Sequence, residues 1–459
     1  MIQQFINRGS ELKFLEKKYA EDSAQMIIIY GRRRIGKTEL IKKFIQKKES
    51  LYFLCTRDSL LENARDLKRK FYELTGKEYF LELETNSFFD LFKYFTDEVN
   101  DRKVVVAFDE FPYLIEMGKG ITSVFQKIWD EILKDTRIFL ILCGSSIGMM
   151  ETEVLGYKSP LYGRRTGEWK VEPFTFKDVT KMFTYSTEEY IKLYSVFGGT
   201  PFYLTQIDPT LSTEENIKEK ILTKGEILYN EPNILLKQEF REPRIYTLIL
   251  KYLSLGYNSH GKLASVTGIE KGNLSKYLSV LEEKRLIKYI LPLGRRKRGI
   301  YVTDDTLFNF WFRFVYPNLS DLEIGLVDDV FSRILSQLNS YYGLMYKQFI
   351  LDLIRTKNIS LPFSIHEVKK WWHKGREIDV VVLNAETKEI LFVECKWKDD
   401  VNAEKVLVAL KEKAEHVPWF NTSRTEYFAV FAKSFSRRSK DCLCFDLNNL
   451  ERILESRLG

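Results

Sequence analysis

The sequence predicts an α/β protein of several domains, in which a mostly parallel β-sheet is covered by helices on both faces. Two observations support this fold class. The chain has 459 residues, which at about 100 to 200 residues per domain is enough for two to four domains. Within residues 24–200, short apolar runs alternate with longer helical patterns, and buried strands separated by helices are typical of a parallel sheet.

The apolar runs divide the chain into four expected parts. Residues 1–205 contain five runs that we interpret as the strands of the parallel sheet: Met26–Tyr30, Leu51–Cys55, Val104–Phe108, Ile138–Cys143 and, more weakly, Glu168–Val171. Residues 206–240 have the charged pattern of a helical lid or linker. Residues 241–325 predict helices followed by a basic strand pair. Residues 326–459 return to an α/β pattern, with strands at Glu377–Leu383 and Ile390–Lys396.

Composition excludes several classes of protein. Hydrophobic residues make up 44% of the chain, yet its apolar runs are far shorter than the roughly 20 residues that cross a bilayer, so we expect a soluble protein without a membrane segment. Residues 1–8 lack the pattern of a secretory signal. The five cysteines are scattered and make no zinc spacing with the four histidines, which favours a reducing cytoplasm. A net charge of +7 permits an acidic partner without requiring one.

A phosphate-binding loop follows the first expected strand. Residues 31–38 read Gly-Arg-Arg-Arg-Ile-Gly-Lys-Thr and lead into a helical pattern. Gly31 and Gly36 allow backbone N–H groups to turn toward phosphates, Lys37 can reach the terminal phosphates, and Thr38 offers a hydroxyl to Mg²⁺. The pattern therefore predicts an ATP site with Mg²⁺, and a glycine turn with an incidental lysine is the alternative interpretation.

Two carboxylates, Asp109 and Glu110, follow the third expected strand. The carboxyl ends of strands are where open α/β sheets bind ligands. Asp109 can complete the shell of the Mg²⁺ ion, while Glu110 orients and deprotonates a water for attack on the γ-phosphate. Alone, such a pair is often a solvated turn; together with the phosphate loop it indicates nucleotide hydrolysis.

The middle part resembles a winged helix-turn-helix. Residues 262–289 predict helix, glycine turn, helix and strand, and leucines at 274, 278 and 281 recur at helical spacing. This spacing turns Asn273 and Lys276 outward on the second helix, which enters the major groove in such domains. A basic hairpin tip follows, consisting of Arg295, Arg296, Lys297 and Arg298, a composition suited to phosphate contacts. We therefore expect DNA as a partner, and docking of a protein is the alternative.

The C-terminal strands bring charged residues together. Glu394 and Lys396 are two apart on a strand and share a face. A hairpin that is symmetric about residues 386 and 387 places Asp379 across from Glu394, with Cβ atoms roughly 5 Å apart. Carboxylates so placed repel one another unless a cation lies between them. We therefore expect a metal-dependent phosphodiesterase site with Asp379 and Glu394 as ligands and Lys396 as the group that holds water or phosphate.

Residues 5–204 resemble the archaeal-type P-loop ATPases of the AAA+ and STAND group. The matching segments are residues 7–12, GRRRIGKT, VVVAFDEF, ILCGSS, LYGRRTGE and GGTPFYL. The resemblance implies roles for further residues. It places Arg8 near the adenine, gives the γ-phosphate sensor as Ser145 or Ser146, and lets the Gly199-Thr200-Pro201 segment, with Pro201, close the nucleotide site. It also implies that Arg164 and Arg165 present an arginine to a phosphate.

That arginine could act on the chain's own nucleotide or in trans on a neighbour's, and the second case requires a homo-oligomer. Simpler interpretations stay open. Arg164 and Arg165 could be plain surface charges, and the glycines before Pro201 could simply end a helix.

Residues 340–450 resemble the restriction-endonuclease-like PD-(D/E)XK nuclease core. The resemblance implies an acidic residue on the preceding helix, where this chain has Lys347. A salt bridge from Lys347 to Glu377 or Glu394 would give a metal-free fold. Two functions remain open. The first is an ATP-hydrolysing protein that couples nucleotide state to DNA binding, with DNA cleavage by the C-terminal domain. The second is a nucleotide-switched DNA- or protein-binding regulator whose nuclease-like domain is inactive.

Overall fold

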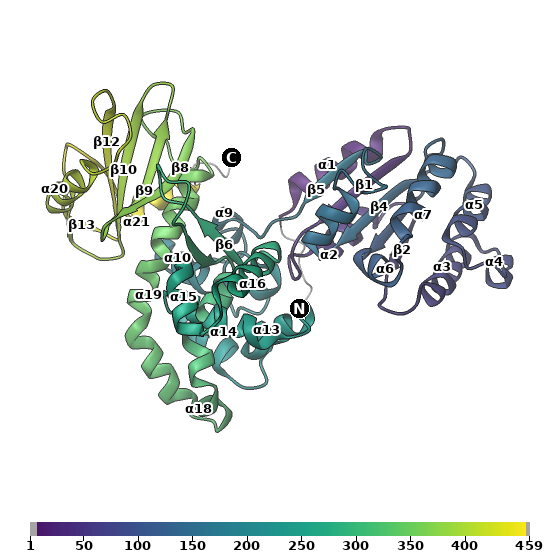
Figure 1. Ribbon diagram of the computed structural model, residues 1–459, viewed down its shortest axis with the longest axis horizontal. Helices are drawn as coiled ribbons and strands as arrows, with labels where there is room; N and C mark the ends of the chain where they lie inside the picture. Colours follow the sequence, from purple (N-terminus) through teal and green to yellow (C-terminus); the bar gives the residue numbers. More distant parts are fainter. Residues whose placement is uncertain (1–6, 456–459) are drawn as a thin grey trace. The chain divides into compact units, whose positions relative to one another are not determined.

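The computed structural model describes residues 7–455, which belong to two compact units, Met1–Pro173 and Phe174–Gly459 (Figure 1). Residues 1–6, at the start where we expect no secretory signal, and residues 456–459 lie outside the described residues. Within the described part of the chain, no helix is both long and apolar enough to cross a membrane. The domain boundaries near residues 205, 240 and 325 stay predictions.

A five-stranded parallel sheet forms the centre of the first unit, in the order β2-β3-β4-β1-β5. Its strands are β1 (Gln25–Tyr30), β2 (Ser50–Leu54), β3 (Val105–Asp109), β4 (Phe139–Gly144) and β5 (Gly167–Lys170). All five strands predicted from the apolar runs are confirmed to within a residue or so at each end. Because the strands are parallel, the ends of β1, β3 and β4 that carry the candidate nucleotide residues lie at one edge of the sheet.

Helices cover both faces of this sheet. Ile27 and Ile29 face a core shared with helices α1 (Gly9–Ala20) and α2 (Lys37–Ile45). Met26 and Ile28 face the opposite core. That second core is built with α3 (Leu60–Thr75), α5 (Phe88–Val99), α7 (Ile121–Ile128) and the π-helix η1 (Trp129–Leu133). Every residue of β1 is therefore buried, which explains why the strand is an unbroken apolar run rather than an alternating one.

The second unit begins with helices. They are α9 (Phe176–Val179), α10 (Thr187–Phe197), α11 (Pro201–Leu204), α12 (Thr213–Asn216), η3 (Ile217–Leu222) and α13 (Ile227–Glu239). The helical pattern expected within residues 206–240 is confirmed. Next come α14 (Pro243–Ser254), α15 (His260–Thr267), α16 (Lys271–Glu283) and an antiparallel strand pair, β6 (Ile287–Ile290) with β7 (Ile300–Thr303). The 29-residue helix α19 (Val327–Arg355) then leads to the C-terminal sheet.

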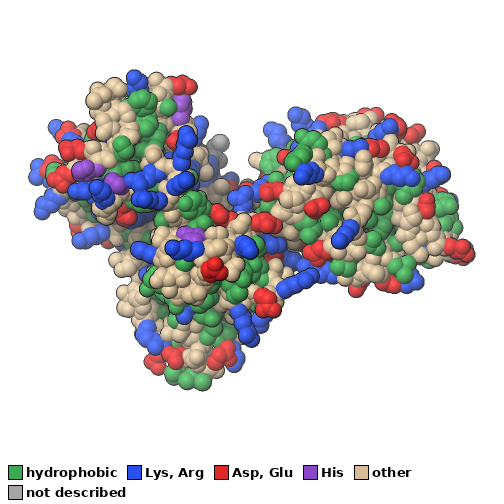
Figure 2. Space-filling model, viewed as in Figure 1, with side chains coloured by type: hydrophobic (Ala, Val, Ile, Leu, Met, Phe, Trp, Pro, Cys, Tyr) green, Lys and Arg blue, Asp and Glu red, His purple; other side chains and the backbone are tan. Residues whose placement is uncertain are grey.

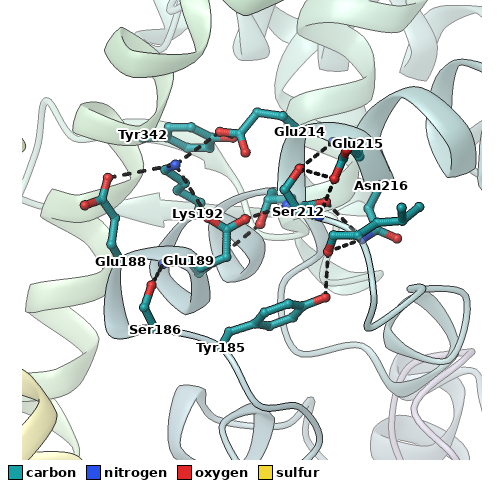
Figure 3. A network of polar contacts seen from close by, with 12 residues as sticks. Tyr185, Ser186, Glu188, Glu189, Lys192, Ser212, Glu214, Glu215, Asn216 and Tyr342 are labelled. Carbon is teal, nitrogen blue, oxygen red and sulfur yellow. Dashed lines mark hydrogen bonds and ion pairs between the residues drawn. The ribbon is translucent and has the colours of Figure 1, made fainter.

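A polar network ties three of these helices together (Figure 3). The Lys192 ammonium of α10 lies 3.5 Å from Glu189 and 3.4 Å from Glu214, which is on α12. The hydroxyl of Tyr342, on α19, donates to the same Glu214 carboxylate at 3.2 Å. Because one partly buried cation serves carboxylates from two helices, loss of Lys192 would leave like charges facing one another. The network therefore holds α10, α12 and α19 in fixed positions relative to one another.

The C-terminal sheet has five strands in the order β14-β12-β10-β9-β8. They are β8 (Glu367–His373), β9 (Arg376–Asn384), β10 (Glu389–Lys396), β12 (Thr425–Ala432) and β14 (Leu443–Phe445). Both strands predicted from the sequence, β9 and β10, are confirmed. The sheet packs on α19 and on α20 (Ala403–Ala414), and it is completed by a short β11–β13 pair (Val401–Asn402, Phe435–Arg437) and by α21 (Leu447–Glu455).

The register of this sheet has two consequences for the charged residues. Leu383 pairs with Ile390 and Val380 with Val393, so the hairpin is symmetric about residues 386 and 387, as predicted. On the other side, Lys369 pairs with Val381 but Trp371 pairs with Ile378. Between these two pairs, β8 has one residue, Lys370, whereas β9 has two, Asp379 and Val380. A bulge of this kind re-aims a side chain, here that of Asp379.

Candidate functional site

The phosphate loop, residues 31–38, joins β1 to α2 in a conformation that requires glycine at two places. Gly36 has φ of 83° at the start of α2, in the left-handed region that favours glycine. A Cβ on Gly31 would lie 2.3 Å from the carbonyl oxygen of Val171. Gly36 lets the chain turn into the helix, and Gly31 lets the loop pass close to the segment after β5. The loop therefore presents its backbone at the N-terminus of α2.

Two basic side chains hold this loop from within. The Lys37 ammonium, which is buried, donates to the carbonyl of Arg32 at 2.9 Å. Arg8 is also buried, and its guanidinium donates to the carbonyls of Ile35 at 2.7 Å and Glu172 at 2.8 Å. Arg8 thus ties the chain ahead of β1 to the loop, and Lys37 closes the loop on itself.

Asp109 is the centre of hydrogen bonding at the end of β3. Its side chain is buried, and one carboxylate oxygen accepts from Thr38 Oγ1 at 2.6 Å and from the Tyr52 hydroxyl at 2.7 Å. The other oxygen accepts from the backbone N–H of Glu110 at 3.0 Å. Burial and the Asp109 charge raise the pKa of Tyr52, so that the tyrosine stays a donor. The hydroxyl and carboxylate oxygens at this place are the ligand type that Mg²⁺ prefers, so the residues present fit that ion.

Glu110 has an unusual backbone conformation at the end of β3. Its φ is 55°, which is uncommon for a residue with a side chain. The Glu110 carboxylate accepts from Ser145 Oγ at 2.7 Å and from Ser145 N at 3.3 Å, just after β4. Of the two candidate sensors, Ser145 is the one that contacts Glu110. Ser146 precedes the short helix α8 (Ile147–Met149) without a side-chain cap bond.

The two arginines of the LYGRR segment bind carboxylates of their own chain. Arg164 makes a bidentate contact with Asp130, at 2.9 and 2.7 Å, and donates to a carbonyl of Pro160 at 2.8 Å. Arg165 pairs with Glu168 at 2.6 Å. Arg164 therefore holds the segment that precedes β5 in place, whereas Arg165 forms one ion pair among residues 7–455.

The Gly-Gly-Thr-Pro segment belongs to the second unit. Pro201 is the first residue of α11. A Cβ on Gly199 would lie 1.8 Å from the carbonyl oxygen of Phe174, and the Gly199 carbonyl accepts from Phe174 N at 2.7 Å. The second glycine is therefore required by close backbone contact at the start of that unit.

The C-terminal carboxylates are buried and each is paired with lysine. Asp379 accepts from the Lys347 ammonium of α19 at 2.7 Å and from the backbone N–H of Cys395 at 2.9 Å. Lys347 also contacts Glu377 at 3.0 Å, which is one of the two salt bridges considered from the sequence. Burial lowers the pKa of Lys347, but the Asp379 and Glu377 charges outweigh it and raise that pKa.

Glu394 is held by two other lysines. Its oxygens lie 2.7 Å from Lys396 and 2.9 Å from Lys413 of α20. Burial raises the pKa of Glu394, and the two ammonium groups more than reverse this, so that it is lowered. The pKa of Asp379 is raised by burial and by the Glu394 charge. The sequence did not indicate Lys413, because nothing in its spacing relates it to Glu394.

The middle segment has the exposure pattern expected from its sequence. The three leucines of α16, at 274, 278 and 281, are fully buried. Asn273 and Lys276 are exposed on the other side of the helix. In the loop between β6 and β7, residues 296–298 are exposed, while Arg295 is half-buried and its Nη2 lies 2.6 Å from His373 Nδ1.

The first unit has the features of one class of protein. A parallel sheet, a glycine loop leading into a helix, and a Thr38–Asp109 bond beside Glu110 define a P-loop ATPase domain. Comparisons with known proteins agree. A family model described as an ATPase domain predominantly from Archaea matches residues 5–207, and one described as Archaea bacterial proteins of unknown function matches residues 311–408.

An uncharacterized protein of Methanocaldococcus jannaschii is 34% identical over 456 residues, which is 97% of this chain and 99% of the relative. The chain belongs to the family of that protein, and its residues 5–207 match the archaeal ATPase domain. An uncharacterized ATP-binding protein of the same organism is 58% identical over 48 residues, 10% of this chain and 81% of the relative. The solved Walker-type ATPase of Pyrococcus abyssi is 22% identical, with a TM-score of 0.49, and the match covers 68% of this chain and 97% of that one.

The contacts of Asp109 predict that removing the hydroxyl oxygen of Tyr52 lowers the stability of the protein. Tyr52→Phe removes one donor from a buried carboxylate, and a hydrogen bond to a charged group contributes about 1.5 to 3 kcal/mol. We expect the free energy of unfolding, measured by urea denaturation, to fall by about that amount. Tyr72→Phe, which loses the same atom without a hydrogen bond seen in the described residues, is the matched control. Equal losses in both variants would contradict the role assigned to Asp109.

Proposed function

We propose that this protein hydrolyses ATP at residues 31–38 and that its nucleotide state controls binding to duplex DNA. The observation that supports this most directly is the continuous set of contacts from Thr38 to Asp109 and from Glu110 to Ser145. These contacts connect the residues proposed to hold Mg²⁺ with a second carboxylate, which can accept a proton. A structural turn would not need both carboxylates to be oriented in this way.

Each residue of the nucleotide site then has a defined role. Thr38 and Asp109 would hold Mg²⁺, which when bound stabilises the charge that develops on the phosphates. Lys37 exchanges the Arg32 carbonyl for the terminal phosphates. Glu110 accepts the proton of the attacking water, and Ser145 positions the Glu110 carboxylate until nucleotide is bound. Arg8, which is bonded to the loop, positions the segment proposed to contact the adenine.

The remaining proposed residues act at the margins of this site. Ser146 is the second candidate for sensing the γ-phosphate, and Pro201 belongs to the segment proposed to close the site. Arg165 is better suited than Arg164 to act on a phosphate, in cis or in trans in a homo-oligomer. Its ion pair with Glu168 is easier to exchange than the bidentate contact of Arg164 with Asp130. We place this activity in a reducing cytoplasm, in keeping with the five free cysteines of the described residues.

DNA binding is assigned to the segment from α14 to β7 as a winged helix-turn-helix. Its support is the arrangement of a helix with three buried leucines and a polar outer face, followed by an antiparallel hairpin with a basic tip. Asn273 and Lys276 are exposed where such a helix would face the major groove. Residues 295–298 supply the phosphate contacts.

The C-terminal domain is proposed to be nuclease-like but inactive. The lysine contacts of Asp379 and Glu394 support this reading over metal-dependent cleavage. Three ammonium groups already compensate two buried carboxylates, and Lys347 lies directly against Asp379. A divalent cation would have to displace them at the cost of unpaired buried charge.

Glu110→Gln tests the assigned base. The variant should bind ATP with Mg²⁺ as wild type does, while phosphate release falls by about 100-fold or more, because the proton acceptor is lost. Lys37→Ala should instead weaken ATP binding. Glu116→Gln, the same change at a nearby carboxylate that forms an ion pair with Arg57 at 3.3 Å, should behave as wild type. Wild-type phosphate release from Glu110→Gln would rule out the role of this residue.

Salt dependence tests the DNA assignment. Replacing residues 296–298 by alanine removes three cations, so the slope of log affinity against log salt for a duplex should flatten by up to about 0.9 for each lost contact. Titrations by fluorescence anisotropy at several salt concentrations measure this slope. An unchanged affinity and slope would instead identify the tip as a surface for a protein partner.

Lys347→Glu tests whether the ammonium takes the place of a metal ion. The change leaves Asp379 unpaired and adds a third carboxylate beside it, so a divalent cation becomes the favoured partner. Calorimetry without nucleotide should detect Mn²⁺ binding to Lys347→Glu and none to the Lys347→Met control. Mn²⁺ binding by wild type that is abolished by Asp379→Asn, or nicking of plasmid DNA by wild type, would refute the inactive assignment.

A further inference from the structure

The tip of the β6–β7 hairpin is attached to the C-terminal sheet. Strand β8 is an edge strand of that sheet. The backbone N–H of Leu293, in the hairpin loop, donates to the carbonyl of Lys370 on β8 at 2.9 Å. The Leu293 side chain is buried in the same core as Trp371 and Ile378. The loop therefore contacts the edge of the sheet and gives a partner to a backbone carbonyl of the edge strand.

A second contact fixes the basic end of the loop. Arg295 Nη2 lies 2.6 Å from His373 Nδ1, at the end of β8. A guanidinium only donates, so the contact is a hydrogen bond when this nitrogen of His373 is the acceptor, in the neutral ring. Burial and the charges of Arg295 and Lys374 lower the pKa of His373, which favours that form. The hairpin tip and the end of β8 are thus held as one piece.

The turn that follows β8 presents a cation in a strained conformation. His373 pairs with Arg376, so Lys374 and Gly375 form a two-residue turn, with φ of 46° and 80°. Turns with two positive φ values favour asparagine or glycine at the first position, and a lysine there costs about 1 to 2 kcal/mol. Arg298, at the hairpin tip, also has positive φ, 64°.

Five exposed cations on these two turns have no ion pair within residues 7–455: Arg296, Lys297, Arg298, Lys374 and Arg376. The carboxylates nearest in sequence to Lys374 and Arg376 are Glu377 and Asp379, and both contact Lys347. Asp304, the carboxylate that follows the hairpin tip, contacts Lys288 at 2.9 Å. Figure 2 shows Lys and Arg side chains gathered on the face where the β6–β7 loop and β8 lie in Figure 1. The surface is therefore positive without local compensation.

We propose that the hairpin tip and the β8–β9 turn form one pre-assembled surface that binds the phosphate backbone of duplex DNA. This rests on the proposed DNA binding and extends it onto the C-terminal domain, with Lys374 and Arg376 as added contacts. Unpaired cations gain affinity by releasing counterions from DNA. The docked loop does not have to be ordered on binding, which lowers the entropic cost.

The test compares two double variants of the full-length protein. Lys374→Ala/Arg376→Ala should weaken duplex binding at low salt and flatten the salt slope by about 1.8, that is about 0.9 for each of two contacts. Lys405→Ala/Lys440→Ala removes the same charge from exposed positions elsewhere on the C-terminal domain and should leave the slope unchanged. Matching slopes for the two variants, while replacement of residues 296–298 still weakens binding, would overturn the inference and leave the proposed function intact.

Two further outcomes bear on both proposals. Absence of salt-dependent duplex binding by wild type would refute both. Single-stranded DNA bound as tightly as duplex would overturn the assignment of the partner.

Leu293→Ala tests the docking itself without changing charge. It should speed tryptic cleavage after residues 295–298 and reduce duplex affinity at an unchanged ATPase rate. Faster cleavage with undiminished duplex affinity would refute the claim that the surface must be pre-assembled.

Discussion

The buried carboxylate of Asp109 is the interaction on which the nucleotide site depends. A charge removed from water must be satisfied by donors, and here these come from the start of α2, from β2 and from the backbone of Glu110. The Thr38 bond holds the end of the phosphate loop against β3, and the Tyr52 bond joins β2 to the same carboxylate. They also leave Glu110 at positive φ with its carboxylate directed to Ser145, so that two adjacent carboxylates take up different tasks.

Two buried carboxylates of the C-terminal sheet, Asp379 and Glu394, are satisfied in a different way. Asp109 is held by neutral hydroxyl and amide donors, which leave its negative charge uncompensated and available to a metal ion. Asp379 and Glu394 are held by ammonium groups, so their charge is already compensated within the chain. Removing one partner of such a pair is costly, whereas the pair itself has little need of a cation. Residues of the same type thus suit opposite chemistry because of what surrounds them.

Rigid connections within the second unit matter for any nucleotide-controlled function. The network around Lys192 joins α10, α12 and α19, and Lys433 extends it from the C-terminal sheet to Glu188 at 2.9 Å. The β6–β7 loop is fastened to β8. A change in the position of α10 would therefore move the hairpin and the C-terminal sheet together, as the proposed control of DNA binding by the nucleotide state requires.

The sequence by itself determined those features that local periodicity and spacing encode. These include the five parallel strands, the phosphate loop, the buried leucines of α16 and the symmetric register of the β9–β10 hairpin, from which the proximity of Asp379 and Glu394 was inferred. Strand β8 was missed because an edge strand rich in lysine and tryptophan lacks an alternating pattern. Only the tertiary structure decided which partners the charged groups take: Lys347 for Asp379, Lys413 for Glu394, Asp130 for Arg164 and His373 for Arg295. These pairs join residues between 19 and 78 positions apart. No short-range pattern records such contacts, because they depend on how the helices and strands pack and not on the spacing within any one of them.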